Sequence, residues 1–298
     1  MTDLSRKFTA NDSALCFAFA TAVYLLLSVV SGAVLSVTEQ GSLVYWLIIA
    51  ANNALLGVSA WVFAKIRKKD FVSAMHANAA PKIPFVLWGV GVVVGLVFFM
   101  TPIVNWLCDL IEAVGLSRPT VSLPKQFVPL LLTATFLPAL SEEFLFRGVI
   151  GNGFANDFAS KTKAALLTGA LFSLFHANPA QTLHQFILGS FLAVTVFQSG
   201  SVWTAVILHF VNNLVSVVGE FVLPQWLPTH PITCVCGAVV VVVMLFGYFN
   251  CAKKYAQQDK VSQKDGEQVA KVIDSSMLYA LIASVCVFVL LWCAVLFG

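Results

Sequence analysis

The stretch Ser141-Glu142-Glu143-Phe144-Leu145-Phe146-Arg147-Gly148 places three charged side chains inside an apolar run that extends from about Phe127 to Ile150. A run of this length is typical of a helix that crosses a membrane. Each charged side chain near the centre of a bilayer costs about 2.5–3.5 kcal/mol on insertion scales. We therefore expect these charges to be compensated inside the protein and to serve a function.

The spacing of the charges separates one carboxylate from the other two groups. Glu143 and Arg147 are four residues apart, with the acid on the N-terminal side, so they can pair along one helix face. Glu142 lies about 100° round the helix and is left without that counter-charge. Pro138 lies one turn earlier, frees the carbonyl of Ala134 and predicts a bend. An unpaired carboxylate beside a bend indicates a site with a cavity.

Composition assigns the chain to the multi-pass membrane proteins. Of its 298 residues, 59% are hydrophobic and only 10% are charged, whereas soluble domains carry about 25% charged residues. The net charge of +3 gives no reason to expect a nucleic-acid partner. The seven cysteines fall mostly in or beside apolar runs, without a CxxC or zinc-like spacing, and are predicted to be small buried hydrophobes.

The apolar runs predict an all-α polytopic membrane helix bundle with about 8–9 transmembrane helices. The first run is too long for a signal-peptide core and is predicted to be an uncleaved span. Two central runs are short for spans, so they could both cross or form a re-entrant pair. The predicted helices are 14–37, 43–64, 85–107, 127–150, 164–176, 183–196, 202–222, 232–249 and 277–297, with a polar linker of about 25 residues before the last.

The positive residues predict a cytoplasmic N-terminus and a C-terminus outside. With that orientation only Arg118 and Lys125 fall in outside loops, as the excess of cytoplasmic Lys and Arg in membrane proteins requires. The cytoplasmic loops would then hold Arg6, Lys7, Lys65, Arg67, Lys68, Lys69, Lys82, Lys161, Lys163 and the linker lysines Lys253, Lys254, Lys260, Lys264 and Lys271.

Further polar side chains recur at helical spacing inside the apolar runs. Phe172 and His176 are one turn apart in one run, and His209 and Asn213 share a face in another. A desolvated Glu142 can act as a base, and an imidazole can hold the same water. Interface or packing roles are predicted for a scattered set: Asn52, Asn53, Asn105, His184 and Glu220.

Together these groups suit attack by water on an amide carbonyl. His209 and Asn213 can both donate to one oxygen, as an oxyanion hole does, and no serine or cysteine nucleophile is needed. Three other interpretations stay open. Polar groups can join helices structurally; Glu142, His176 and His209 could bind zinc, although H-E-x-x-H is absent; and Glu and His can relay ions in a transporter, although paired broken helices are not seen.

Three motifs in this order, Glu142-Glu143-x-x-x-Arg147, Phe172-x-x-x-His176 and His209-x-x-x-Asn213, resemble those of the CPBP family. This family comprises the CAAX prenyl endopeptidases and their bacterial relatives, also called the Abi family. The resemblance covers 127–222, between N-terminal helices with an interfacial segment (1–126) and C-terminal helices with a polar cytoplasmic linker (223–298).

The resemblance implies a metal-independent glutamate protease with no cofactor, in a bundle of about eight helices. Glu142 would activate water with help from His176, and His209 and Asn213 would bind the oxyanion. Supporting residues would be Glu143, Arg147 and Phe172. The implied partners are the lipid bilayer and a peptide or membrane-protein substrate, lipidated ones included. The implied location is the bacterial plasma membrane. Because some relatives act in bacteriocin self-immunity or as scaffolds, a non-proteolytic protein is the alternative, as is a metal-dependent membrane protease.

The predicted helix ends leave one conflict of depth. Counted from the cytoplasmic ends, Glu142 lies about eight residues deep and His176 about thirteen. The two can meet only if the helix with Glu142 continues past Gly151, or if the helix with His176 is tilted or shifted towards the cytoplasm.

Overall fold

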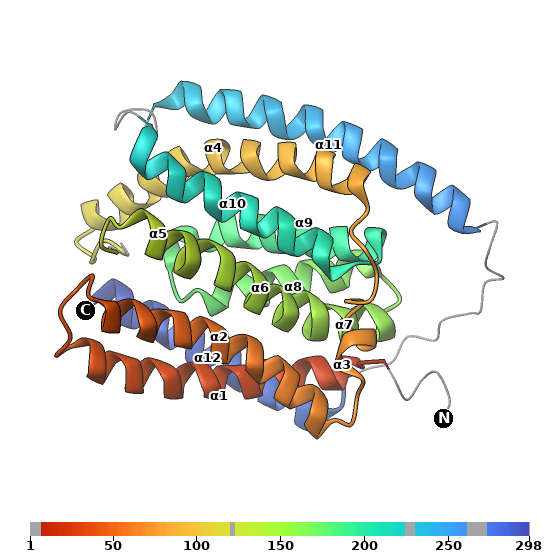
Figure 1. Cartoon of the computed structure of the whole chain (residues 1–298), viewed down its shortest axis with the longest axis horizontal. Coiled ribbons are helices and arrows are strands. Elements are labelled where there is room, and N and C mark those ends of the chain that lie inside the picture. The colour runs from red at the N-terminus through yellow and green to blue at the C-terminus, as the bar shows by residue number, and fades with distance from the viewer. Residues whose placement is uncertain (1–6, 120–122, 224–229, 261–272, 298) are drawn as a thin grey trace.

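The computed structural model describes residues 7–119, 123–223, 230–260 and 273–297, and the regular secondary structure within these ranges is helical. The long helices run side by side along the long axis of the molecule (Figure 1). Eight of them are long and apolar enough to cross a membrane. The predicted all-α polytopic bundle is confirmed, and the chain is an integral membrane protein.

The N-terminal helices α1 (Ala10–Leu35) and α2 (Leu43–Ile66) form an antiparallel hairpin, and a salt bridge joins the start of α1 to the end of α2. Thr9 and Asp12 cap the start of α1 reciprocally, each side chain accepting from the backbone N–H of the other. The buried Asp12 also accepts a hydrogen bond through Oδ1 from Nε of Arg67, which follows α2, at 2.6 Å. The short α3 (Phe71–Ala74) follows, in the segment predicted to be interfacial.

The site-bearing helix, which carries Glu142 and Glu143, is continuous and longer than predicted. It runs to Asp157, seven residues beyond the expected end at Ile150, and includes two π-helical segments. Its parts are α5 (Phe127–Leu130), η2 (Leu131–Phe136), α6 (Leu137–Glu143), η3 (Phe144–Gly151) and α7 (Asn152–Asp157).

The irregularity expected at Pro138 takes the form of the π-helix η2. Proline lacks an N–H, so the regular hydrogen-bond ladder cannot continue through it. The N–H of Leu137 bonds to the carbonyl of Leu132, five residues back. Asn53 of α2 donates to the carbonyl of Thr133 at 3.2 Å. Backbone groups released by the π turn are therefore satisfied by side chains, as the interior of a membrane requires.

Helices α8 (Lys161–Phe175) and α9 (Thr182–Ser199) form a second hairpin, and the 3₁₀ turn η4 (Pro179–Gln181) lies between them. They pack at glycines: a Cβ on Gly189 would lie 3.0 Å from the Cα of Gly169. With 15 residues, α8 is about 22 Å long, shorter than the hydrocarbon core of about 30 Å. It therefore ends inside the bundle.

The conflict of depth is resolved by the length of the site-bearing helix. Glu142 lies 15 residues before Asp157, and His176 lies 15 residues after Lys161. These two helix ends are joined by a short connection, so Glu142 and His176 reach the same level. Of the two expected solutions, the continuation past Gly151 is the one observed.

Helices α4 (Ile83–Ala113), α10 (Val202–Val222) and α11 (Pro231–Lys260) cover the other side of the site. The prediction of a polar linker directly after residue 249 is wrong, because α11 continues about eleven residues further. In this extension Tyr255 packs on Phe85, with ring centroids 5.4 Å apart. Lys253 and Lys254 of α11 point outwards. Arg6, Lys264 and Lys271 lie outside the described residues.

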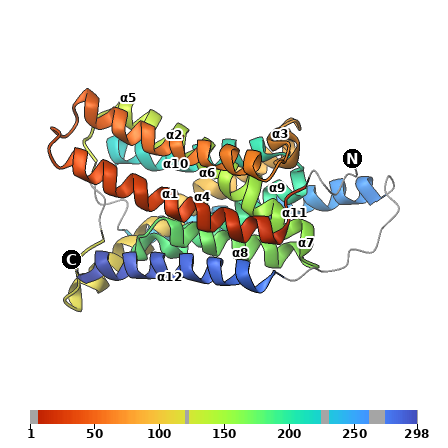
Figure 2. The same cartoon turned by 90° about the horizontal axis from the view of Figure 1, so that it is seen from below.

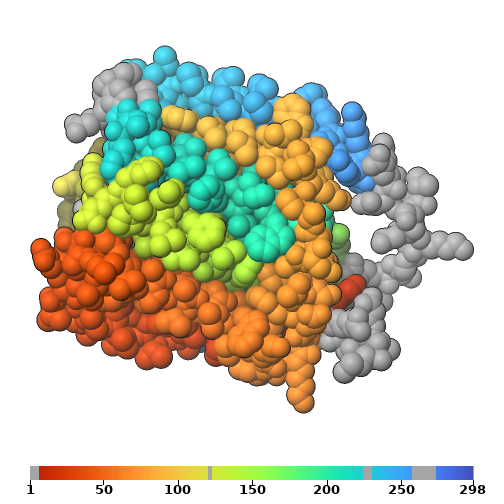
Figure 3. Space-filling model, in the orientation of Figure 1, coloured from red at the N-terminus to blue at the C-terminus, as the bar shows by residue number. Residues whose placement is uncertain are grey.

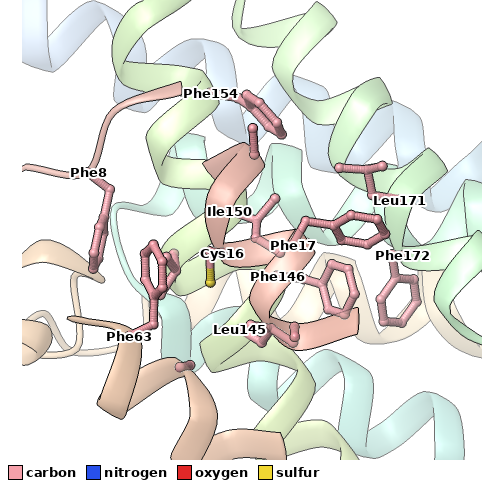
Figure 4. Close-up of a cluster of buried hydrophobic side chains, with 14 of the residues drawn as sticks. Phe8, Cys16, Phe17, Phe63, Leu145, Phe146, Ile150, Phe154, Leu171 and Phe172 are labelled. Carbon is pink, nitrogen blue, oxygen red and sulfur yellow. The ribbon is translucent and has the colours of Figure 1, made fainter. Parts of the chain in front are cut away.

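Two apolar clusters hold these helices together, and the polar site lies where they meet. The first is formed by α1, α2, η3, α8 and α12 (Ser275–Phe297) and includes Phe146 and Phe172, whose rings pack edge-on (Figure 4). The second is formed by α4, α9, α10 and α11 and includes Leu208, the neighbour of His209. Phe172 contacts His209 with ring centroids 5.8 Å apart, so the clusters are continuous across the site.

The outer surface is apolar where lipid is expected. Figure 3 shows the site-bearing helix reaching the surface between α2 and α10, and its Val128, Leu132 and Phe136 are exposed there. The start of α1 and the end of α12 lie at opposite ends of the bundle (Figures 1 and 2). The end of α2 and the starts of α4 and α8, which carry predicted cytoplasmic cations, lie at the same end as the start of α1.

Candidate active site

The predicted pair of Glu143 and Arg147 forms and is fully buried. Arg147 Nη1 donates to Glu143 Oε1 at 2.7 Å, and both side chains have 0% exposure. Arg147 Nη2 donates to the carbonyl of Gly189 at 3.1 Å. Its guanidinium carbon lies 4.2 Å from the ring centroid of Phe172, a cation–π distance. Arg147 thus joins the site-bearing helix to both α8 and α9.

The same carboxylate orients His209 on α10. The Nδ1–H of His209 donates to Glu143 Oε1 at 2.7 Å. A hydrogen bond from one ring nitrogen decides which nitrogen remains for chemistry. The Nε2 of His209 consequently faces Glu142, 3.9 Å from Oε2.

A backbone carbonyl orients His176 at the end of α8. Its Nδ1 lies 2.9 Å from the carbonyl oxygen of Phe172. Since a carbonyl can only accept, Nδ1 carries the hydrogen, and Nε2 of the neutral ring has a lone pair. That Nε2 lies 3.9 Å from Oε2 of Glu142.

Glu142 therefore has one oxygen between two imidazoles. Both 3.9 Å distances end on Oε2, which makes no hydrogen bond to any described residue. A distance of 3.9 Å is too long for a direct hydrogen bond but suits a bridging water. The described residues hold no group of three or more His, Cys, Asp or Glu side chains arranged to hold a metal ion.

One comparison with known proteins gave a match. Residues 124–215 match the family model described as "Type II CAAX prenyl endopeptidase Rce1-like". The central segment of the chain is therefore similar to the CAAX endopeptidases. The chain is accordingly a peptidase, a hydrolase that acts on peptide bonds, embedded in a membrane. The matched segment includes every residue of the three motifs. The curated proteins and solved structures searched gave no match to this chain.

In this endopeptidase Phe172 packs behind the two imidazoles. Its ring lies edge-on to His176, with centroids 4.7 Å apart, and it is fully buried. A cavity lies beside Glu142, and the phenylalanine of α8 that lines it is Phe175, about one turn after Phe172. Phe172 thus supports the two imidazoles and the Arg147 guanidinium from behind, and Phe175 lies at the open side.

Asn213 is the predicted residue that the endopeptidase structure does not join to the others. It lies one turn after His209, and its Oδ1 accepts from Asn212 Nδ2 at 3.1 Å. No hydrogen bond links it to Glu142 or His176 in the described parts of the chain. The bond to Asn212 uses its acceptor and leaves the Nδ2 donor available.

The cavity beside Glu142 brings in helices that the sequence motifs do not cover. It has a volume of about 240 Å³ and is lined in part by Glu142 and His176. The rest of the lining comes from α1, α2 and Phe175. The polar residues that α1 and α2 contribute are Tyr24, Ser28, Asn52 and Asn53. The N-terminal helices were predicted only as spans, because no spacing rule relates them to residues more than 80 positions away.

His184 is a second contribution that sequence reasoning missed. It is the third residue of α9. Its side chain lies near Asn212, His176 and His209, and its buried Nε2 has no hydrogen-bond partner among the described residues. It therefore belongs to the polar surroundings of the site. The sequence gave no reason to expect this, because His184 has no polar partner at helical spacing.

Proposed function

We propose that this chain is a metal-independent glutamate endopeptidase in which Glu142 is the general base. The observation that carries the proposal is the position of Oε2 of Glu142, 3.9 Å from Nε2 of both His176 and His209. A water bound there would face the cavity. Glu142 removes a proton from this water, and the water oxygen attacks the peptide carbonyl carbon. The C–N bond then breaks, and the proton passes to the leaving amine.

His176 holds the water from its other side. The hydrogen on Nδ1, directed at the Phe172 carbonyl, leaves the Nε2 lone pair free to accept from the water. The two acceptors, Oε2 of Glu142 and Nε2 of His176, can bind the two hydrogens of one water. The water oxygen then presents a lone pair to the substrate.

His209 and Asn213 stabilise the negative oxygen that forms. Because Nδ1 of His209 already donates to Glu143, a second donation from Nε2 requires both ring nitrogens to carry a hydrogen. This imidazolium donates from Nδ1 to Glu143 and from Nε2 to the oxyanion. Asn213 adds its Nδ2, with its oxygen held by Asn212. Glu143 and Arg147 position His209 and do not touch the substrate.

Location and substrate are part of the proposal. The cation-bearing helix ends at one end of the bundle support a cytoplasmic N-terminus in a bacterial plasma membrane. The opposite position of the end of α12 supports a C-terminus outside. The catalytic core is assigned to 127–222, with 1–126 and 223–298 as flanking helices. The substrates proposed are peptides or membrane proteins, lipidated ones included.

The deciding experiment is peptide cleavage by the purified protein in detergent. Glu142→Gln removes the base without changing side-chain size and should lower kcat by at least about 10²-fold. Glu220→Gln is the matched control, because Glu220 is exposed at the end of α10, and it should keep full activity. Wild-type turnover in Glu142→Gln would refute the mechanism.

The rival interpretations give different results in the same preparation. A metal-dependent protease would lose activity with a chelator and contain stoichiometric metal. If the protein is a scaffold or a self-immunity protein, the Glu142→Gln variant would still support its function in cells. The glutamate mechanism requires chelator-resistant cleavage and loss of the cellular function together.

A further inference from the structure

Two adjacent carboxamides lie at the middle of α2 and face the cavity beside Glu142. Asn52 and Asn53 are the tenth and eleventh of the 24 residues of α2, far from either end of the span. Both line the cavity together with Glu142 and His176. A polar side chain at this depth is costly unless it is hydrogen-bonded or serves a function.

The role of Asn53 is structural. Its Nδ2 donates to the carbonyl of Ile49 at 3.0 Å and to that of Thr133 at 3.2 Å. The first bond lies within α2, and the second joins α2 to the π-helix η2. Both hydrogens of the amide are therefore used to satisfy backbone carbonyls.

Asn52 differs from its neighbour. Its side chain makes no hydrogen bond to any residue in the described ranges, although it is only partly exposed and lines the cavity. Its donor and its acceptor are thus both available to a bound molecule. Because Glu142 and His176 line the same cavity, a molecule bound to Asn52 would lie beside the proposed water.

The main-chain hydrogen bonds of the occupant limit its shape. A cavity of about 240 Å³ admits a short stretch of chain. In a helix the main-chain N–H and C=O groups bond to one another, so a helical segment has none to exchange with a carboxamide. Only an extended stretch can therefore bond to Asn52 through its main chain.

We propose that Asn52 binds the main chain of the substrate next to the bond that is cut, and that the substrate enters as an extended peptide segment. A carboxamide has one carbonyl acceptor and an N–H donor, like a peptide group, so it can exchange two hydrogen bonds with any peptide unit. Recognition at this position is therefore independent of substrate side chains. A transmembrane helix must unwind, or present a chain end, before it is cut. This inference rests on the proposed function, because it places the substrate against Glu142.

The test measures peptide affinity in the Glu142→Gln background, so that cleavage does not disturb binding. In Asn52→Leu, a fluorescent linear peptide that the wild type cleaves should bind about 5- to 30-fold more weakly, as expected for two lost hydrogen bonds. Asn152→Leu is the matched control, because the Asn152 amide donates to the carbonyls of Gly148 and Ala74 and does not line this cavity. It should lower the thermal unfolding temperature and leave the affinity of the folded protein unchanged. Equal affinity in Asn52→Leu would overturn the inference.

Two changes to the peptide keep the inference testable if Asn52→Leu does not fold. Replacing backbone amides by esters one at a time should reveal one position that weakens binding at least about 3-fold to protein with Asn52 intact. That loss should be absent in Asn52→Ala. A peptide of the same sequence stapled as a helix should not bind. A flat ester scan, or equal binding of the stapled peptide, would contradict the inference.

The failure of the inference and that of the proposed function are distinguishable. Cleavage that persists in Glu142→Gln refutes the glutamate mechanism, whereas unchanged affinity in Asn52→Leu refutes only the main-chain contact. If the affinity depends on Asn52 and the Glu142→Gln variant still cleaves peptide, the binding site is supported and the glutamate mechanism is refuted.

Discussion

His209 donates from Nδ1 to Oε1 of Glu143 at 2.7 Å, and the same oxygen receives Arg147. One buried carboxylate oxygen therefore holds both the imidazole that faces Glu142 and the guanidinium that reaches α9. Because all of these groups are inside the bundle, the loss of one leaves the others without compensation. Stability and activity should depend on this contact together.

Glu143→Gln should destabilise the protein strongly. It leaves the fully buried Arg147 without a counter-charge, and breaking a buried pair in this way costs about 3–5 kcal/mol. Thermal unfolding in detergent, followed by fluorescence, measures the change. Glu112→Gln is the control, since its bridge to Arg118 is exposed and such pairs contribute about 0–1 kcal/mol. Equal unfolding temperatures for the two variants would show that the buried pair is not required.

Asn213→Ala tests the oxyanion contact that the structure leaves unformed. Loss of one oxyanion donor lowers kcat by about 10²- to 10³-fold, with little effect on KM. Steady-state cleavage of a peptide separates the two constants. Ser216→Ala, three residues further along α10, should change neither, because the hydroxyl of this exposed residue donates to the carbonyl of Asn212 in its own helix. A change confined to KM would assign Asn213 to substrate binding instead.

Gly189→Ala should disturb the site from the back. The added Cβ would lie 2.8 Å from the Phe172 ring and 3.0 Å from Gly169, so α9 must move away from α8. The carbonyl of Gly189, which accepts from Arg147, would move with it. We expect lower thermal stability and lower kcat. Gly32→Ala adds the same methyl group to α1 where nothing lies within 4 Å, and it should be neutral. Comparable losses in both variants would contradict this explanation.

The pKa of His76, in the loop before α4, should lie below its ordinary value of 6.5. Although the residue is exposed, partial desolvation of its ring lowers this pKa, and the charges of Lys7 and Lys161 lower it further. Because the folded protein disfavours the charged ring, this residue reduces stability as the pH falls below about 6.5, through the lower folded pKa, and has no such effect above it. An NMR titration of the labelled ring measures the pKa directly.

The same titration in two lysine variants identifies the source of the shift. Lys161→Gln should raise the pKa of His76 towards 6.5, because it removes one of the charges that lower it. Lys163→Gln, two residues along α8, should leave the pKa nearly unchanged. A pKa that is the same in Lys161→Gln and in the wild type would attribute the shift to desolvation alone.

Several features of the fold and site could be predicted because they depend on neighbours along one helix. The apolar runs located the spans, and the spacing of Glu143 and Arg147 predicted their pair, because helical periodicity brings residues four apart together whatever surrounds them. The end of a helix was less predictable. The seven residues after Ile150 have no strong apolar signal, yet they extend the helix and bring Glu142 to the level of His176.

What only the tertiary structure decided is which side chains from different helices meet. Asn52 and Asn53 are identical in type and adjacent, and both line the cavity. Their sequence positions cannot show that Asn53 bonds to the backbone of η2, whereas Asn52 makes no hydrogen bond to the described residues. Likewise, the order of the motifs does not state that Nε2 of both imidazoles lies beside one oxygen of Glu142. Periodicity acts within a helix, whereas convergence depends on how glycines and aromatic rings set the distance and rotation of neighbouring helices.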